Sequence, residues 1–322
     1  MGPLPSGRDR NFSIDGYEPV ALRAWREGGF EAKVAAARDE LAHCLACPRD
    51  CGVNRLLDER GICHTGRRPY VASAFPHFGE EDCLRGRNGS GTIFFSFCNL
   101  KCVFCQNWDI SSQEAGQAMT AEELADLMLR LQAAGCHNIN FVTPEHVAPQ
   151  IVEAIAVAVP AGLRLPIVYN TSAYDAIRSL ELMDGLVDIY MPDFKLWEPE
   201  SSQRLLRAKD YPDRARAAIA EMQRQVGVLK LGPDGLARCG LLVRHLVMPA
   251  HVDESAAIFQ WLHDQISPDT YLNIMGQYRP EHRVPESERY EDIDRRPEPS
   301  EMVHAVAAAR QAGLWRLDQR EA

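Results

Sequence analysis

The sequence has no uninterrupted run of the roughly 18 or more apolar residues that a membrane-spanning helix needs. It also has no run of five or more Lys and Arg, and Asp and Glu outnumber Lys and Arg by 45 to 35. A nucleic-acid backbone would meet net repulsion from such a chain, so we do not expect DNA or RNA as a partner. The N-terminus lacks the apolar central region of a secretory signal, and we therefore expect a cytoplasmic protein without a membrane partner.

Disulfide bonds are not expected in a reducing compartment, although the chain contains ten cysteines. Cysteines that cluster along such a chain indicate metal or redox chemistry instead. Two groups stand out in the sequence: Cys44, Cys47, Cys51 and Cys63, and then Cys98, Cys102 and Cys105. The isolated Cys83, Cys136 and Cys239 are predicted to be packing residues.

From residue 92 onward, apolar β-type runs alternate with helical patterns about six times. The strand candidates are residues 92–97, 138–143, 166–170, 187–191, 241–247 and 270–275. Continuous apolar strands that alternate with helices are typical of a parallel sheet covered by helices, either doubly wound or barrel-shaped. Six units favour an α/β fold of the partial (β/α)6 TIM-barrel type, preceded by a small N-terminal cysteine-rich subdomain of helices and loops.

We divide the chain into an N-terminal helical and cysteine-rich region (1–90), a barrel core (91–275) and a C-terminal loop and helix (276–322). The helices expected are 18–42, split at Gly28 and Gly29, then 120–134, 147–159, 174–183, 213–226, 253–266 and 300–312. Thr120 and Glu123 form a predicted capping box, and Ser300 is a predicted N-cap. A hairpin is expected at 228–240 and a surface loop at 276–299.

Cys98, Cys102 and Cys105 follow the first predicted strand with the spacing Cys-x3-Cys-x2-Cys. The same spacing describes one face of a helix, so three packing residues are one interpretation. A zinc site is a second, but structural zinc needs four ligands and no His or Cys follows closely after Cys105. A third interpretation is an iron–sulfur cube held by three thiolates, which leaves its fourth iron open to a small molecule.

The stretch "SGTIFFSFCNLKCVFCQNWDIS", with the aromatic Phe104 before the third cysteine, resembles the radical S-adenosylmethionine (SAM) enzymes. It looks like the branch related to the pyruvate formate-lyase activating enzyme, often labelled as its uncharacterised homologues. The resemblance implies a [4Fe–4S] cluster on Cys98, Cys102 and Cys105 whose open iron binds SAM. Reductive cleavage of SAM then gives a 5′-deoxyadenosyl radical that abstracts hydrogen from a substrate. It also implies an electron donor such as a flavodoxin or ferredoxin, and a glycyl radical enzyme as a possible protein substrate.

Polar residues at the ends of the second and third strands would face this cofactor, because barrel active sites lie at the carboxyl ends of the strands. The second strand ends in "FVTPEH", which departs from the Gly-Gly-Glu type motif that binds the methionine amino group in many such enzymes. Thr143 and Glu145 take its place here, with a helix-entry turn as the alternative. In "YNTSAYD", Asn170, Thr171 and Ser172 suit a ribose or carboxylate, with helix capping as the alternative.

The fourth strand ends in "IYMPDFKL", in which Asp193 and Lys195 resemble an Asp-x-Lys element of the activating enzymes. The resemblance implies that Lys195 meets the cofactor carboxylate, while a surface ion pair is the alternative. In the fifth strand, Arg244 and His245 interrupt an apolar run. Because an unpaired buried charge is costly, we expect one of them to point into the site.

The N-terminal stretch "CLACPRDCGVNRLLDERGIC" can wrap one metal ion or cluster with Cys44, Cys47, Cys51 and Cys63. The resemblance covers this element too, and zinc and a second iron–sulfur cluster both remain open. Two alternatives to an activating enzyme also remain. One is radical modification of another small molecule, a peptide or RNA; the other is a non-catalytic iron–sulfur or zinc protein for electron transfer or scaffolding.

Overall fold

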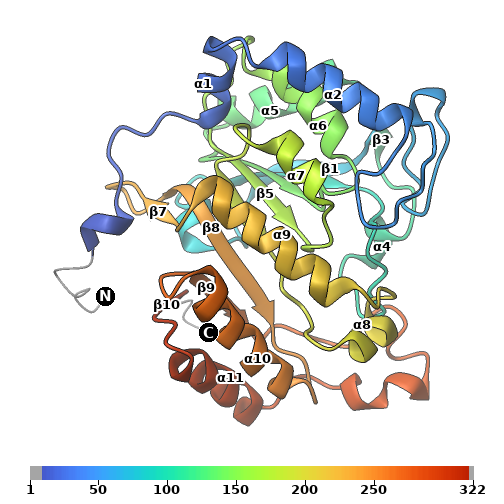
Figure 1. Cartoon of the computed structure of the whole chain (residues 1–322), viewed down its shortest axis with the longest axis vertical. Coiled ribbons are helices and arrows are strands. Elements are labelled where there is room, and N and C mark those ends of the chain that lie inside the picture. The colour runs from blue at the N-terminus through green and yellow to red at the C-terminus, as the bar shows by residue number, and fades with distance from the viewer. Residues whose placement is uncertain (1–8, 319–322) are drawn as a thin grey trace.

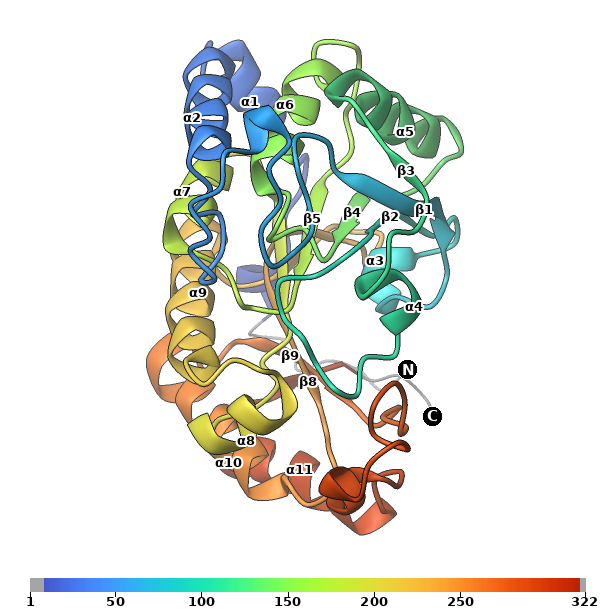
Figure 2. The same ribbon diagram turned by 90° about the vertical axis from the view of Figure 1, so that its right-hand side faces the viewer.

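The structure is a computed structural model that describes residues 9–318 (Figure 1). All six predicted strands are present and parallel: β2 (Ser90–Phe95), β4 (Ile139–Val142), β5 (Ile167–Thr171), β6 (Ile189–Pro192), β8 (Ala237–Leu246) and β9 (Tyr271–Met275). They lie side by side in chain order, and helices cover one face of the sheet (Figure 2). The predicted partial barrel is therefore confirmed.

Two edges of the sheet were not predicted. β1 (Tyr70–His77) pairs antiparallel with β2 and with the short β3 (Gln117–Ala118), and β10 (Arg316–Leu317) extends the parallel sheet beyond β9. The predicted hairpin is confirmed, because β7 (Lys230–Leu231) pairs antiparallel with the start of β8. Within residues 9–318 the strand order runs from β10 to β3 without the two edges pairing, so the sheet is an open barrel.

The predicted helices are also present. They are α1 (Val20–Arg26), α2 (Phe30–Ala42), α5 (Ala121–Ala133), α6 (Ala148–Ala158), α7 (Ile177–Met183), α9 (Tyr211–Val226), α10 (Val252–Trp261) and α11 (Pro299–Gln311). The capping box of Thr120 and Glu123 is confirmed, whereas α11 is capped by Glu298 with Glu301 and not by Ser300. Ser300 lies inside the first turn, because the helix begins at Pro299, a residue whose fixed φ suits that position.

Short helical segments complete the fold. They are α3 (Asp82–Arg85), α4 (Trp108–Ser111), α8 (Pro199–Leu205), three 3-10 segments (Asp9–Phe12, Arg55–Leu57 and Glu288–Ile293) and a π-helical turn (Leu262–Ile266) after α10. In the described part of the chain, no helix combines the length and the apolar content needed to span a membrane.

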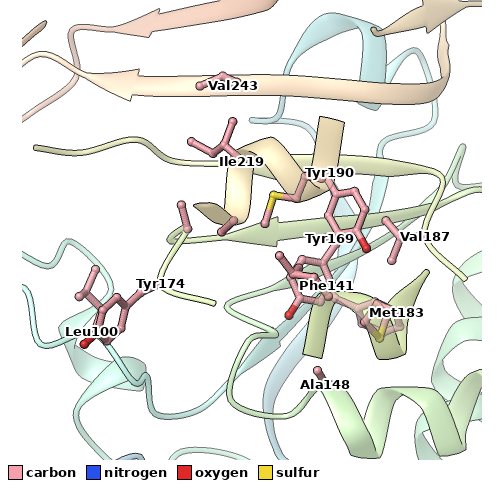
Figure 3. Close-up of a cluster of buried hydrophobic side chains, with 14 of the residues drawn as sticks. Leu100, Phe141, Ala148, Tyr169, Tyr174, Met183, Val187, Tyr190, Ile219 and Val243 are labelled. Carbon is pink, nitrogen blue, oxygen red and sulfur yellow. The ribbon is translucent and has the colours of Figure 1, made fainter. Parts of the chain in front are cut away.

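The main core lies between the sheet and its helices (Figure 3). Side chains alternate across a strand, so every second residue faces this layer. The rings of Tyr169 and Tyr190 meet edge to face at 5.5 Å, and Phe95 stacks on Phe141 at 6.0 Å. Cys136 belongs to this core, as predicted for an isolated cysteine.

A smaller apolar cluster lies on the opposite face of the sheet, inside the barrel. Val168, Ile189 and Leu242 meet Cys83 and Leu84 there, and the last two come from α3. Because α3 precedes β2, it covers the end of the barrel at which the parallel strands begin. The floor of the barrel is therefore packed, and the buried Ser90 and Asn138, which bond each other there, complete it with Asn138 donating to Leu84 O of α3.

Candidate functional site

The loop after β2 carries the three clustered cysteines. It begins at Phe97, whose φ of +67° is rare for a residue with a side chain, and Cys98 follows directly. Burial raises the pKa of Cys98 well above its ordinary value, and the charges of Glu145, Cys102 and Cys105 raise it further. Burial also raises the pKa of Cys102 to about 12. The mutual influence of the thiols shows that the loop gathers them in one place.

Segments distant in the sequence hold this loop. The backbone N–H of Val103 donates to Leu205 O at 2.9 Å, and Arg283 N donates to Val103 O at 3.0 Å. The Phe104 ring is buried and meets the Tyr278 ring edge to face at 5.9 Å. The resemblance implied that Phe104 contacts the cofactor, but its ring packs against Tyr278 of the 276–299 segment. That segment, predicted as a surface loop, lies against the cysteine loop.

Glu145 is fully buried next to the thiols. Its Oε1 accepts hydrogen bonds from the backbone N–H (3.1 Å) and the hydroxyl of Ser172. Its Oε2 has no partner in the described residues, and burial raises the pKa of this carboxyl. A buried oxygen without a partner is costly, so this atom fits a site completed by a hydrogen-bond donor from a ligand.

The ends of β4 and β5 are joined at the same point. Thr143 has a φ of +59°, and its N–H donates to Asn170 O at 2.9 Å. Thr171 donates its hydroxyl to Asp175 Oδ2 at 2.6 Å, and it does not cap α7, whose N-cap is Ala176. Thr143, Asn170 and Ser172 therefore come together with Glu145, whereas Thr171 does not.

A chain of charges crosses the barrel mouth from β8 to β6. Arg244 Nε donates to Asp193 Oδ1 at 2.7 Å, and Arg244 Nη2 donates to Asn170 Oδ1 at 2.7 Å. Lys195 Nζ donates to Asp193 Oδ2 at 2.6 Å. Although burial opposes it, Arg244 and Lys195 hold the pKa of Asp193 below its ordinary value. Asp193 and Lys195 are thus largely buried in this network and do not form an ordinary surface pair.

His245 is a correction to the sequence prediction. Its ring bonds Phe194 O (2.7 Å) and Ser255 Oγ (2.8 Å) and packs on the Phe259 ring of α10. Neighbouring residues on a strand point to opposite faces, so Arg244 faces the mouth and His245 faces the helices. Of the two, Arg244 is the one that faces the barrel mouth, and His245 belongs to the core.

Sequence reasoning missed Tyr211 of α9, which joins the ends of β5 and β6. Its hydroxyl lies 3.1 Å from Ser172 O and 2.7 Å from Asp193 O, and it accepts the Lys195 N–H at 3.0 Å. Asp175 was also missed; burial and the charge of Glu145 raise its pKa to about 8. Neither residue lies at a strand end, and no signal in the sequence marks them.

The N-terminal cysteines lie beside the same loop. Burial raises the pKa of Cys44, and of Cys47 to about 12, and both interact electrostatically with Cys63. Cys51 lies with Ile62, whose N–H donates to its sulfur at 3.4 Å, while the fully buried Arg55 donates to Cys63 Sγ at 3.1 Å. Three of the four thiols are therefore grouped. Within residues 9–318, neither cysteine group is arranged in the geometry of bound metal ligands.

The mouth combines three thiols, one buried carboxylate with a partnerless oxygen, and two cations. Opposite charges at fixed positions suit a ligand that carries both an ammonium and a carboxylate group. By its chemistry, this set of side chains suits a cluster with three thiolate ligands next to a zwitterionic molecule.

The chain is similar to a curated protein and, more distantly, to solved structures. An uncharacterized protein of Methanocaldococcus jannaschii is 31% identical over 313 residues, which cover 95% of this chain and 85% of that protein. Among solved structures, Streptococcus suis SuiB bound to precursor peptide SuiA aligns with a TM-score of 0.45 and 12% identity, over 67% of this chain and 43% of that one. Methylornithine synthase (PylB) aligns with a TM-score of 0.40 and 14% identity, over 91% and 81%.

The family model described as "Radical SAM superfamily" matches residues 92–236. This range begins on β2 and contains Cys98, Cys102 and Cys105 together with Glu145 and Lys195. The motif, the fold around it and the match to the family model lead to the same assignment: the chain belongs to the radical SAM superfamily of enzymes.

Proposed function

We propose that this protein binds a [4Fe–4S] cluster through Cys98, Cys102 and Cys105 and cleaves SAM reductively. The superfamily implies both cofactors. The cluster and SAM together supply the chemistry, an electron transfer that splits a carbon–sulfur bond of the sulfonium and yields a 5′-deoxyadenosyl radical for hydrogen abstraction. The observation that carries the proposal is the buried Glu145 Oε2 without a partner, next to three thiols at the carboxyl end of β2.

The chain's own charges fit the two ends of the amino-acid part of SAM. Glu145 Oε2 would accept a hydrogen bond from the ammonium group of SAM. Ser172 holds the Glu145 side chain in place by donating to its Oε1. Lys195 is held by Asp193 at 2.6 Å and would pair with the SAM carboxylate. Asn170 and Thr143 stand beside Glu145, where they would add polar contacts to the nucleoside.

Water exclusion is the other role of the fold. Glu145 is 0% and Asn170 5% exposed, and the packed cluster under α3 closes the floor of the barrel. A reactive carbon radical requires such a dry cavity, because solvent and buffer would otherwise quench it. The chain therefore confines the chemistry to the mouth, beside the cysteine loop.

For the substrate we propose a glycyl radical enzyme as protein partner, with a flavodoxin or ferredoxin as electron donor. The support is the likeness of the stretch "SGTIFFSFCNLKCVFCQNWDIS" to the activating enzymes. For Cys44, Cys47, Cys51 and Cys63 we propose a second metal site, either zinc or an iron–sulfur cluster. The electrostatic contact of Cys63 with Cys44 and Cys47 supports it.

The test uses anaerobically reconstituted protein reduced with dithionite. We expect conversion of SAM to 5′-deoxyadenosine and methionine, and loss of this activity together with the cluster absorbance in Cys98→Ala. Cys136→Ala is the matched control, because it also removes one thiol but from the helix-side core. A cluster-loaded protein that binds no SAM would contradict the proposal and favour a non-catalytic iron–sulfur protein.

Metal analysis tests the second site on the same samples. Cys44→Ser combined with Cys47→Ser should remove zinc, or about four irons, per chain without stopping SAM cleavage outright. An unchanged metal content in this double variant would show that these cysteines are structural.

A further inference from the structure

A basic pocket lies against the cysteine loop, with Leu100, Lys101 and Cys102 in its lining. Its volume is about 290 Å³, and its lining includes Arg49, Lys101, Arg207 and Arg283 but no Asp or Glu. The chain as a whole carries a net charge of −10. The pocket therefore concentrates four positive charges, with no negative one, on a chain that is negatively charged as a whole.

Most of these cations have no partner. Within residues 9–318, the side chains of Lys101, Arg207 and Arg283 form no hydrogen bond or ion pair, whereas Arg side chains elsewhere in the chain commonly pair with carboxylates. Arg49 donates through Nε to Asn99 O (2.9 Å) and through Nη1 to Arg207 O (3.0 Å). Its Nη2 is buried and has no partner in the described residues. The Arg49 guanidinium also lies over the Tyr174 ring, 5.0 Å from its centroid, so Arg49 is fixed in the pocket wall, and Lys101, Arg207 and Arg283 supply the unpaired charges.

The pocket is assembled from four separate parts of the chain. Arg49 comes from the N-terminal cysteine segment, Lys101 from the cluster loop, Arg207 from the turn after α8, and Arg283 from the C-terminal loop. These segments gather on the right-hand side of the molecule in Figure 1. The site is held in shape, since the His282 ring in its wall stacks on Trp108 at 5.7 Å and 18°.

We propose that this pocket binds a small, multiply charged oxyanion of the di- or triphosphate class. Guanidinium groups match phosphate oxygens with two parallel hydrogen bonds, and clustered cations repel one another until an anion neutralises them. One carboxylate would leave most of the four cations unpaired, so a ligand with several negative charges fits better. The concave shape and the volume of about 290 Å³ favour a small molecule over the flat acidic surface of a protein.

The pocket adjoins the proposed cluster site. Cys102, one of the proposed cluster ligands, is part of the pocket lining. A phosphate ligand would thus lie against the cluster loop, in a pocket whose lining includes neither Glu145 nor Lys195. That the bound anion adjoins a cluster rests on the proposed function, whereas binding of the anion requires only the four cations.

The test is calorimetry of inorganic tripolyphosphate with the cluster-loaded protein. We expect saturable one-to-one binding that weakens at high salt, because screening reduces attraction between exposed charges. Arg207→Gln and Arg283→Gln should each raise Kd about tenfold, the change that 1.4 kcal/mol produces. Both side chains are exposed, so these variants should fold. Lys209→Gln is the matched control, since it removes the same charge two residues away but outside the pocket lining.

Absence of saturable binding would overturn the proposal. So would an equal effect of Lys209→Gln, or binding of polyglutamate without binding of tripolyphosphate, which would assign the pocket to an acidic protein. SAM cleavage is measured separately without added anion. A protein that cleaves SAM but binds no tripolyphosphate refutes only this inference, and one that binds it but cleaves no SAM refutes only the proposed function.

Discussion

Replacing Arg244 by methionine tests whether the charge network at the barrel mouth stabilises the fold. Methionine keeps much of the length of the side chain but removes its charge and all its donors. The change breaks two 2.7 Å hydrogen bonds, to Asp193 Oδ1 and Asn170 Oδ1, and an ion pair with Glu80 at 3.7 Å. Removing one partner of a buried ion pair costs about 3–5 kcal/mol. Because Lys195 still holds Asp193 Oδ2, we expect the lower end of this range.

Urea denaturation monitored by circular dichroism measures this loss in unfolding free energy. Arg26→Met is the matched control, because Arg26 also pairs with a carboxylate, that of Glu18, but its side chain is 59% exposed. Such a surface pair contributes about 0–1 kcal/mol. If Arg244→Met destabilised the protein no more than Arg26→Met, the network would be solvated and the reasoning on Asp193 would fail.

Three further predictions concern the cofactor, the pH response and a helix cap. Lys195→Ala should weaken SAM binding about tenfold while the cluster absorbance stays unchanged, because it removes the cation that pairs with a carboxylate; equal affinity in equilibrium dialysis would remove Lys195 from the site. Burial lowers the pKa of His245 to about 4, so the unfolded chain binds the proton more tightly and stability is lost as pH falls from about 6.5 to 4. Between pH 7 and 4.5, the unfolding free energy of His245→Gln should therefore fall by about 2–3 kcal/mol less than that of the wild type, as measured by urea titration. Thr120→Ala removes the hydroxyl that accepts the Glu123 N–H at 3.2 Å, and its thermal midpoint should reflect a loss of about 1 kcal/mol; Ser300→Ala, one residue inside α11, should change it far less.

The order of the barrel strands could be predicted from the sequence because each strand is buried on both faces. In β5, for example, Ile167, Val168 and Tyr169 form a continuous buried apolar run that stands out between helical patterns. The edge strands lack this property. In β1 several residues are exposed or half-buried, and β10 spans only Arg316 and Leu317, so neither gives a pattern strong enough to detect.

The sequence predicted those site residues that lie at or just after the end of a strand, and it missed the others. Glu145, Asn170, Ser172, Asp193, Lys195 and Arg244 do come together at the carboxyl ends of the strands. The error on His245 arose because the register of a strand decides which of two neighbours faces inward, and a shift of one residue exchanges them. Tyr211 could not be found, since its hydroxyl reaches the site from a helix, and its position depends on how α9 packs across the sheet.

The cysteine loop depends on parts of the chain that lie outside the matched range of 92–236. Arg49 donates to Asn99 O at 2.9 Å from the N-terminal side, and Gln106 Nε2 donates to Gln277 O at 3.1 Å on the C-terminal side. The Tyr278 ring supports Phe104 from behind. The motif therefore supplies the thiols, whereas both flanking regions fix where those thiols stand. A fragment limited to residues 92–236 would lose all three contacts, and its cluster would be held less firmly than that of the full chain.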